Sequence, residues 1–543
     1  MSRTTGTAGR PVDSVSRPAD ARSQTEAIRG EIPCPTRISV DRRTSILLTL
    51  LWAWVVLPRV IQSLVAPKHR RSAGVDYGGY TATASMTQNL LRAVVFAFCA
   101  LLIAGGVADG RRRSIIALTV FLAPWVFLVL RDLYTGRAPN GDAMLYPVLT
   151  VTIWVLSPGP SSLRIMAHLT ALACLISISM ALLRPSSALF RTADGTVIAA
   201  DKQIIPSGML TGFLTQPNNL GQLVVLGLPA IALLRVTAVR HCYTALAVFT
   251  VVWTASRSSL YALAITGAAA LVVSTRHRTR RAAGSTAIAA AFGAVCVLPF
   301  VTHSPSAYSG RGLIWQSSLP AWQQQPWLGQ GADWYRRLAA TSSSIMSTAF
   351  HGHNQLVQLL VTGGLCYAVL TAIALLLASR AAVRLAATES VFGVLFMVAL
   401  AGTCLLEVSL SVVDNMALLP FVLVPLAVLT FADIGGPAHS PGRAVASAGR
   451  QPPARRSTVR NASSVLVLRD ADACKSHAES APQVAFATTP LPDAAAQDAR
   501  YIPSGTAGGQ QRRLPSERHL RADAAERCIG EQDLCPRPPV AGA

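Results

Sequence analysis

Long apolar runs recur through most of the chain, and they limit its possible folds more than any other feature. A helix needs roughly 20 consecutive apolar residues to cross the hydrocarbon core of a bilayer. About 12 runs reach or approach that length, at residues 44–66, 89–108, 113–131, 143–157, 163–183, 218–237, 241–255, 258–275, 285–302, 354–379, 389–410 and 414–432. They predict an all-α, polytopic integral membrane protein with a transmembrane domain over residues 44–432.

The composition agrees with this class. The 543 residues are 51% hydrophobic and only 14% charged, whereas soluble globular chains carry about a quarter charged residues. The first 43 residues are rich in Arg, Ser and Pro and contain no apolar core, so no cleavable signal is expected. Residues 1–43 and 433–543 lack apolar runs, and we expect both tails to be disordered and cytoplasmic.

The net charge of +22 does not indicate nucleic acid as a partner. Much of this charge lies in the tails and in short loops between apolar runs, where Lys and Arg set membrane topology. A basic patch with interleaved aromatic residues, which nucleic-acid binding favours, is not evident. We therefore expect membrane lipid rather than nucleic acid around this chain.

Basic residues between the runs orient the predicted helices. Arginines precede the first run and follow the second and eighth runs, which places the N-terminus in the cytoplasm. Lys68, Arg70 and Arg71 would then lie outside, so the topology of the first two helices conflicts with the positive-inside rule at this loop. Two sizeable outward loops result, at about 184–217 and 303–353, the second being a long extracytoplasmic loop before the tenth helix.

Four polar motifs lie at the outward ends of the predicted helices. They are TGFLTQPNNLG (211–221), TASRSSLY (254–261), GRGLIW (310–315) with PWLGQG (326–331), and HGHNQL (351–356). Each alone has an ordinary structural interpretation. Arg257 can reach the membrane interface as a helix-end arginine, Gln216 and Asn218 can cap a helix, and the tryptophans can form an interfacial belt.

Together these motifs suggest a chemistry. Guanidinium groups offer rigid donor pairs that suit the oxygens of a phosphate or diphosphate. A histidine can take a proton from a sugar hydroxyl near neutral pH. Arg257, Arg311 and His353 on one membrane face therefore suit the transfer of a glycan from a lipid diphosphate to a hydroxyl. A metal site at His351 and His353 is disfavoured, because few nearby carboxylates are available to complete a coordination shell.

The ordered set TGFLTQPN, TASRSS, GRGLIW, PWLGQG and HNQLVQLLVTGGL resembles the O-antigen ligase and polymerase family of bacterial polytopic membrane glycosyltransferases. The likeness covers about residues 89–430 and is strongest over 211–365. The resemblance implies a fold like that of C-type glycosyltransferases. It also implies transfer of a glycan from a polyprenyl-diphosphate lipid, such as undecaprenyl diphosphate, outside the cytoplasmic membrane, without a metal, a nucleotide sugar or another cofactor.

Residue roles follow from the matching motifs. The resemblance makes Arg257 and Arg311 the residues that hold the diphosphate, and His353 the residue that orients or deprotonates the acceptor hydroxyl. We expect Gln216, Asn218, Trp315 and Asn354 also to bind substrate. His351 has no counterpart in the family pattern and is left out of the core site.

The motifs leave the acceptor open and do not by themselves exclude one other class of protein. The motifs are shared by ligases, surface-polysaccharide polymerases and protein O-oligosaccharyltransferases, so the acceptor can be a glycan, a lipid or a protein. A major-facilitator-type transporter is the alternative from another class. It also has about 12 helices, and GGVADGRRRS (105–114) weakly echoes a loop of that class, but Gly110 replaces its arginine.

Overall fold

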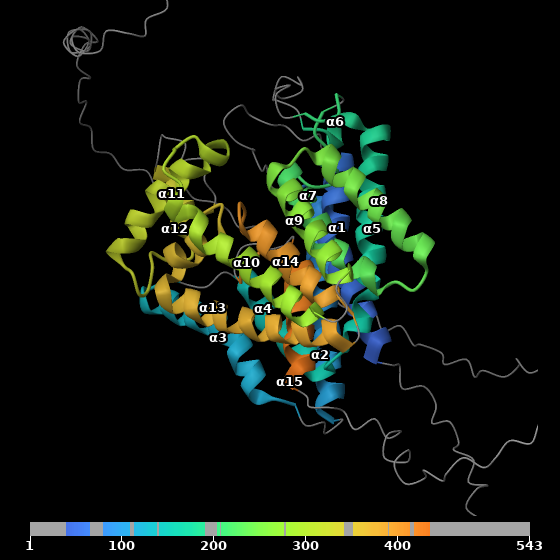
Figure 1. Ribbon diagram of the computed structural model, residues 1–543, viewed down its shortest axis with the longest axis horizontal. Coiled ribbons are helices and arrows are strands. Elements are labelled where there is room, and N and C mark those ends of the chain that lie inside the picture. The colour runs from blue at the N-terminus through green and yellow to red at the C-terminus, as the bar shows by residue number, and fades with distance from the viewer. Residues whose placement is uncertain are drawn as a thin grey trace, which may run out of the picture. The chain divides into compact units, whose positions relative to one another are not determined.

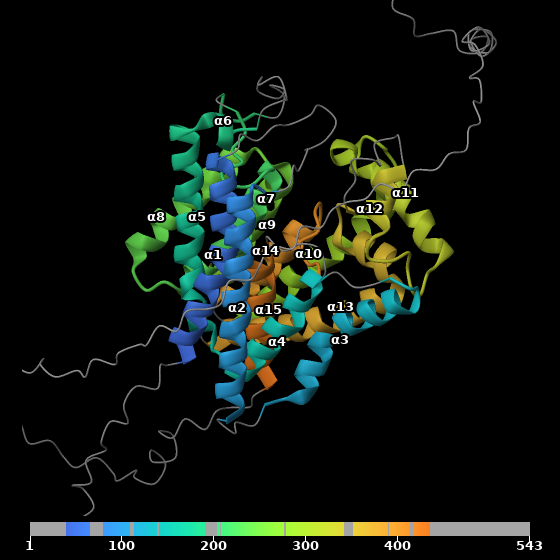
Figure 2. The ribbon, with the colours of Figure 1, turned by 180° about the vertical axis from the view of Figure 1, so that it is seen from behind.

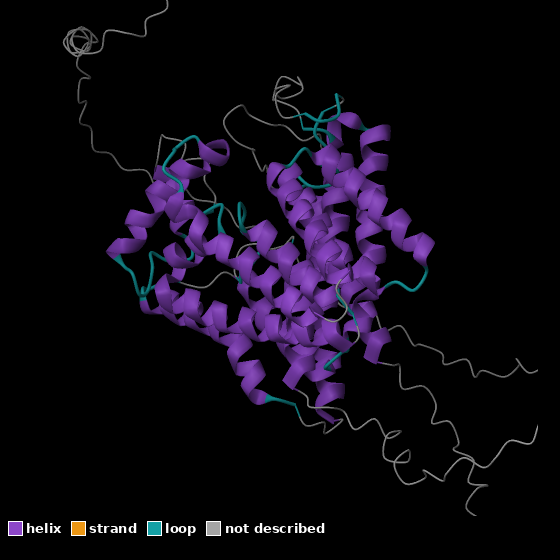
Figure 3. Ribbon diagram, viewed as in Figure 1, coloured by secondary structure: helices purple, strands orange, loops and turns teal. Residues whose placement is uncertain are grey.

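The structure, a computed structural model, describes residues 40–65, 80–108, 113–137, 141–190, 203–206, 208–275, 279–341, 351–388, 390–412 and 418–434. Most of both predicted tails, the 68–71 segment and parts of the two outward loops (191–202, 207 and 342–350) lie outside these residues. Within the described ranges the chain is helical (Figure 3). One isolated antiparallel bridge, between Leu189 and Leu210, is the sole extended pairing there.

Every predicted apolar run coincides with a helix. In chain order these helices are α1 (Val40–Val65), α2 (Ala82–Ala108), α3 (Ile115–Tyr134), α4 (Leu145–Leu156), α5 (Arg164–Leu183), α7 (Pro217–Gly227), α8 (Thr237–Thr254), α9 (Arg257–Thr275), α10 (Arg280–Val301), α13 (Gln355–Thr388), α14 (Phe392–Cys404) and α15 (Leu419–Ile434). The predicted all-α membrane class is confirmed. The prediction that about 12 of them cross the membrane stays a prediction.

Length and composition place all of these helices except α8 in two groups. Among the described residues, seven helical segments are long and apolar enough to cross a membrane: α1, α2, α3, Pro160–Leu183, α9, α10 and α13. The helices α4, α7, α14 and α15 are apolar but shorter. All residues of α14 are buried, which is expected of a helix that is apolar on every side.

Small residues bring the neighbours of α14 close to it. A Cβ added at Gly402 would lie 2.9 Å from the Cα of Ala262 on α9, and one at Gly393 would lie 2.9 Å from the Cα of Ala382 on α13. Small residues at such crossings let helix backbones approach closely within a membrane. The helices α1, α2 and α5 lie side by side in both views (Figures 1 and 2), and α11 and α12 lie at the opposite side of this helical body.

The segment predicted as a long loop, 303–353, contains two helices, α11 (Ala307–Gln324) and α12 (Trp334–Thr341). These helices build a second, smaller core from the buried side chains of Ile314, Trp315, Tyr335, Val357, Val361 and Leu406. Val357 and Val361 belong to α13, and Leu406 follows α14. The outward segment is therefore packed onto the ends of two apolar helices, close to the motifs singled out above.

The PWLGQG motif joins this segment to a kink in α13. At Gly364 the backbone turns to φ 68°, and a Cβ there would lie 2.2 Å from the carbonyl oxygen of Trp327. The N–H of Gln330 donates to the carbonyl of Val361 at 2.6 Å. Only glycine fits both the backbone conformation and the close approach at position 364. The PWLGQG loop (326–331) and the kink of α13 at Gly364 thus form one structural element.

Arg131, near the end of α3, donates hydrogen bonds to the PWLGQG loop. Its Nε donates to the carbonyl of Leu328 at 3.1 Å and its Nη2 to that of Gly329 at 2.6 Å. Asp132 accepts from its Nη1 at 2.9 Å. This buried arginine satisfies loop carbonyls that would otherwise lack donors.

Candidate functional site

The carboxylate of Glu407 is the centre of a polar cluster at the ends of several helices. Glu407 lies three residues after the end of α14, and only 3% of its side chain is exposed. Its Oε1 accepts hydrogen bonds from Nδ2 of Asn218, at 2.9 Å, and from Nη2 of Arg311. Its Oε2 lies 3.1 Å from Nδ1 of His353. Residues from the start of α7, from α11 and from the turn just before α13 therefore meet on one buried anion.

The backbone of His353 adopts an uncommon conformation. Its φ is 47°, in the left-handed region that few residues other than glycine occupy. The preceding Gly352 is fixed on both sides, because its carbonyl accepts from Nε1 of Trp315 at 3.0 Å and its N–H donates to Oε1 of Gln358 at 2.8 Å. Such conformations persist where the surroundings determine them, and they gather at functional sites.

Hydrogen bonds also select the protonation states of the two histidines. Nδ1 of His351 lies 3.2 Å from the backbone N–H of His353 and accepts from it, so that nitrogen carries no proton. Nδ1 of His353 faces the carboxylate of Glu407, which favours a proton on Nδ1. Nε2 of His353 is then the ring nitrogen that can accept a proton from another group.

The environment of His351 favours its neutral form. Partial removal from water lowers the pKa of the His351 imidazole well below its usual value. The nearby His353 and Arg311 add to this shift, and the carboxylate of Glu407 opposes it. The acceptor role of its Nδ1 points the same way. A third of this side chain is exposed, at 34%, and the hydrogen bond that its Nδ1 accepts favours the neutral form independently of burial.

Arg311 is held by three acceptors in the same cluster. Its Nε donates to the carbonyl of Leu406 at 2.8 Å, its Nη1 to that of Tyr308 at 3.0 Å, and its Nη2 to Glu407. A guanidinium group has five N–H donors, so these contacts leave two for a further acceptor. The arginine is oriented before any ligand is present.

Arg257 approaches Arg311 through a left-handed stretch of backbone. Arg257 is exposed at the start of α9, and its Nη1 lies 3.5 Å from Oγ of Ser309. Tyr308, Ser309 and Gly310 all have positive φ, at 53°, 63° and 87°. This turn brings Ser309, the contact of Arg257, within two residues of Arg311. The two arginines that the sequence analysis paired are therefore neighbours in space.

The turn that carries Arg257 packs against α7. The hydroxyl of Ser256 lies 3.1 Å from that of Ser258 and 2.9 Å from that of Ser259. A Cβ added at Gly221 of α7 would lie 2.3 Å from Oγ of Ser259. The absence of a side chain at Gly221 thus lets the helix that begins near Asn218 reach the turn that carries Arg257.

The other sequence-predicted binding residues have different positions. Asn354 is fully buried; its Nδ2 donates to the carbonyls of Val295 and Leu405 at 3.1 Å, and its Oδ1 accepts from the first N–H groups of α13. Trp315 is also fully buried. Gln216 is half-buried just before α7 and makes no side-chain cap. Direct contact of these three with substrate stays a prediction.

Glu407 was missed because nothing near it in the sequence resembles a motif. It is an isolated carboxylate in the apolar stretch that follows α14. The available signal was that isolation, since an ionisable residue inside a predicted membrane segment is by default a functional candidate. Arg131, within the apolar run of α3, carries the same signal.

The cluster also bears on metal binding. His351, His353 and Glu407 each offer one ligand atom, and these atoms lie within 4.8 Å of one another. The carboxylate that the sequence analysis did not find near the histidines is therefore present. Arg311 and Asn218 already engage Oε1 of Glu407, and the guanidinium charge opposes a divalent cation. A site that works without metal stays a prediction.

Comparison with known families supports the resemblance drawn from the motifs. Residues 242–372 match the family described as O-antigen ligase, so the predicted resemblance is confirmed there. Arg257, Arg311 and His353 lie inside this segment, whereas Asn218 and Glu407 lie outside it. A search of curated proteins gives no match. With its several apolar helices and this ligase domain, the chain is a multi-pass membrane protein of polysaccharide biosynthesis.

Proposed function

We propose that this protein is a glycosyltransferase that moves a glycan from a polyprenyl-diphosphate lipid to an acceptor hydroxyl on the extracytoplasmic face of the plasma membrane. The observation that carries the proposal is the carboxylate of Glu407, which gathers Asn218, Arg311 and His353 from distant parts of the chain. The match to O-antigen ligase supports glycan transfer over the transporter alternative.

In this proposal Arg257 and Arg311 bind the diphosphate of the donor. Arg311 retains two N–H donors beyond its protein contacts, and the exposed Arg257 can add its guanidinium from the other side of Ser309. Two positioned cations stabilise the negative charge that accumulates on a leaving diphosphate. Asn218 and Glu407 keep Arg311 in place.

His353 acts as the general base. Its Nε2 takes the proton of the acceptor hydroxyl while that oxygen forms a bond to the anomeric carbon of the glycan. The bond from that carbon to the diphosphate oxygen breaks, and its electron pair leaves with the polyprenyl diphosphate. Attack from the side opposite the leaving group inverts the anomeric centre. Glu407 accepts the hydrogen bond from Nδ1 and stabilises the imidazolium that forms.

The acceptor is a glycan, a lipid or a protein hydroxyl, and these cases correspond to a polymerase, a ligase and a protein O-oligosaccharyltransferase. All three use the same donor and the same base. The cluster determines where the reacting hydroxyl binds but not which molecule carries it. The experiment therefore measures consumption of the donor, which all three cases share.

The test is a transfer assay in membranes containing a lipid-linked glycan, in which wild type is compared with Arg257→Ala, Arg311→Ala and His353→Ala at equal expression. We expect the wild type to consume the donor and release polyprenyl diphosphate, and each variant to lose most of this activity. Uptake of a solute into vesicles without glycan transfer would favour the transporter and exclude the proposal.

A further inference from the structure

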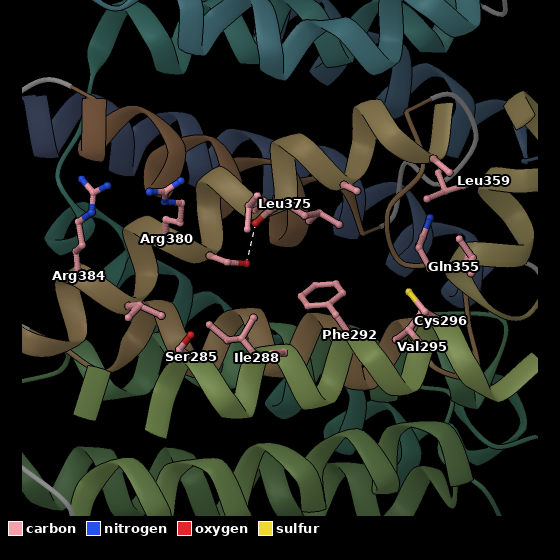
Figure 4. A pocket seen from close by; sticks show the side chains of 17 residues that line it. Ser285, Ile288, Phe292, Val295, Cys296, Gln355, Leu359, Leu375, Arg380 and Arg384 are labelled. Carbon is pink, nitrogen blue, oxygen red and sulfur yellow. Dashed lines mark hydrogen bonds between the residues drawn. The ribbon is translucent and has the colours of Figure 1, made fainter. Parts of the chain in front are cut away.

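A cavity of about 530 Å³ lies between α10 and α13, apart from the Glu407 cluster. Figure 4 shows its walls, which are formed mainly by apolar side chains such as Ile288, Phe292 and Leu375. Several lining residues, among them Ala289, Ala372 and Leu376, are exposed on the surface of the helices. The cavity is therefore a groove that opens sideways toward the surrounding bilayer.

The two ends of the groove differ in chemistry. Arg380, Arg384 and the hydroxyl group of Ser379 line one end, with Ser285 facing them from α10. Gln355 and Cys296 line the other end, and Figure 4 shows them opposite the arginines. Gln355 also donates through Nε2 to the carbonyl of Leu410 at 2.7 Å, so its end of the groove adjoins the segment that carries Glu407.

Further positive charge lies near the arginine end. Arg281 is exposed four residues before Ser285 in α10, and residues four apart share one face of a helix. With the predicted cytoplasmic N-terminus and eight predicted runs before α10, this end lies at the cytoplasmic face. There, anionic lipids attract basic residues, and basic pockets between helices bind anionic head groups.

We propose that this groove binds an anionic phospholipid, with the phosphate on Arg380 and Arg384 and an acyl chain along the apolar walls. The pairing of guanidinium groups with phosphate oxygens is favourable and geometrically specific. On α10 the lining extends over 12 residues, from Ser285 to Cys296, whose first and last members lie about 17 Å apart along the helix axis. One leaflet of the hydrocarbon core is about 15 Å thick, so an acyl chain matches the groove.

The polyprenyl chain of the donor is the other lipid to consider. In the proposed function its diphosphate lies at Arg257 and Arg311, near the Gln355 end of the groove, and the chain itself carries no charge. A polyprenyl chain in the groove would leave Arg380 and Arg384, at the end opposite Gln355, without a role. A lipid with its anionic group at the far end uses both features of the groove, and its binding does not depend on the proposed reaction.

The experiment measures lipid retained by the purified full-length protein with native mass spectrometry, using phosphatidylglycerol and phosphatidylcholine as probes. We expect wild type to prefer phosphatidylglycerol, and Arg380→Gln with Arg384→Gln to weaken that preference at least about tenfold, since each basic residue at a membrane surface contributes appreciably. Arg380→Lys with Arg384→Lys should retain most of it. Ala372→Trp should reduce retention of both lipids by filling the groove.

The matched control is Arg235→Gln with Arg240→Gln, which removes the same charge from exposed positions near the start of α8, outside the lining of the groove. This control should bind phosphatidylglycerol as wild type does. An unchanged preference in the Arg380 and Arg384 double variant would overturn the proposal. Displacement of phosphatidylglycerol from wild type by undecaprenyl diphosphate would overturn it as well, by assigning the groove to the donor. Glycan transfer is not the readout, so either result is independent of the proposed reaction.

Discussion

His353 and Glu407 are joined by a contact of 3.1 Å between Nδ1 and Oε2, although 54 residues separate them in the chain. The carboxylate is buried, while the histidine retains partial exposure at 21% of its side chain. A buried anion behind a partly exposed imidazole is the arrangement that holds a histidine ready to take a proton on its other nitrogen.

His353→Ala should lower glycan transfer by a factor of about 100 or more, because general bases commonly contribute that much. His351→Ala should lower it by less than about tenfold, since His351 only positions His353, through the backbone N–H at 3.2 Å and a ring contact of 4.1 Å between centroids, and such positioning contributes less than the base itself. Both are measured in membranes at equal expression. Equal losses in the two variants would contradict the assignment of the base.

Glu407→Gln should reduce the rate of transfer more than it weakens the apparent affinity for the donor lipid, because the amide oxygen can still accept from Arg311. Glutamine preserves the shape and one acceptor oxygen, but it removes the charge that stabilises the imidazolium form of His353. The measurement is the rate at saturating donor, together with the donor concentration at half-maximal rate. A large rise in that concentration with an unchanged rate would instead place Glu407 in donor binding.

Arg257→Ala and Arg311→Ala should separate activity from stability. Both should lose transfer, on the order of 100-fold, because both remove charge stabilisation at the leaving group. Arg257 is exposed, so its variant should unfold at the wild-type temperature. Arg311→Ala leaves Glu407 buried without its ion-pair partner, and such a loss costs about 3–5 kcal/mol. Thermal unfolding of the purified proteins checks the difference.

Acidification should destabilise the protein partly through His351. Its folded-state pKa lies below the unfolded value of 6.5, so the unfolded chain binds more protons as the pH falls. Stability contributed by the neutral form is present above about pH 6.5 and is lost as the pH falls toward the folded pKa. His351→Asn should reduce the drop in unfolding temperature between pH 7 and pH 5, whereas His241→Asn, at the exposed start of α8, should not.

Gly364→Ala should destabilise the protein, whereas Gly293→Ala should not. At Gly364 an added Cβ meets the backbone of Trp327 at 2.2 Å, and φ is positive. At Gly293 of α10 it meets nothing within 4 Å. A strained backbone position costs about 1–3 kcal/mol, while alanine within a helix is about 1 kcal/mol more favourable than glycine. Opposite shifts in unfolding temperature are expected.

The sequence predicted the helices well because their signal is local. An apolar run of sufficient length identifies a helix wherever it packs, so each predicted run coincides with one. The helices of the 303–353 segment were not predicted, because α11 and α12 contain charged and polar residues and bury only a few side chains each. Their stability comes from packing Trp315 and Tyr335 against α13, which is not visible in a local pattern.

The site was predicted only in part, because motifs are local whereas some of its contacts join distant parts of the chain. Arg257, Arg311 and His353 each belong to a motif, and the structure brings them to neighbouring positions. Glu407 belongs to no motif, and its importance depends on contacts with residues 54, 96 and 189 positions away. Asn354 was predicted to bind substrate, and the structure adds that its amide caps the start of α13 and donates to the carbonyls of Val295 and Leu405.

The position of Glu407 beyond the matched segment has a practical consequence. A fragment bounded by residues 242 and 372 would contain Arg257, Arg311 and the proposed base His353, but not Glu407, which contacts Arg311 and His353, or Asn218, which contacts Glu407. Grafting that fragment into another membrane scaffold would transfer the reactive groups without their alignment. The smallest portable unit of this site therefore extends at least from Asn218 to Glu407.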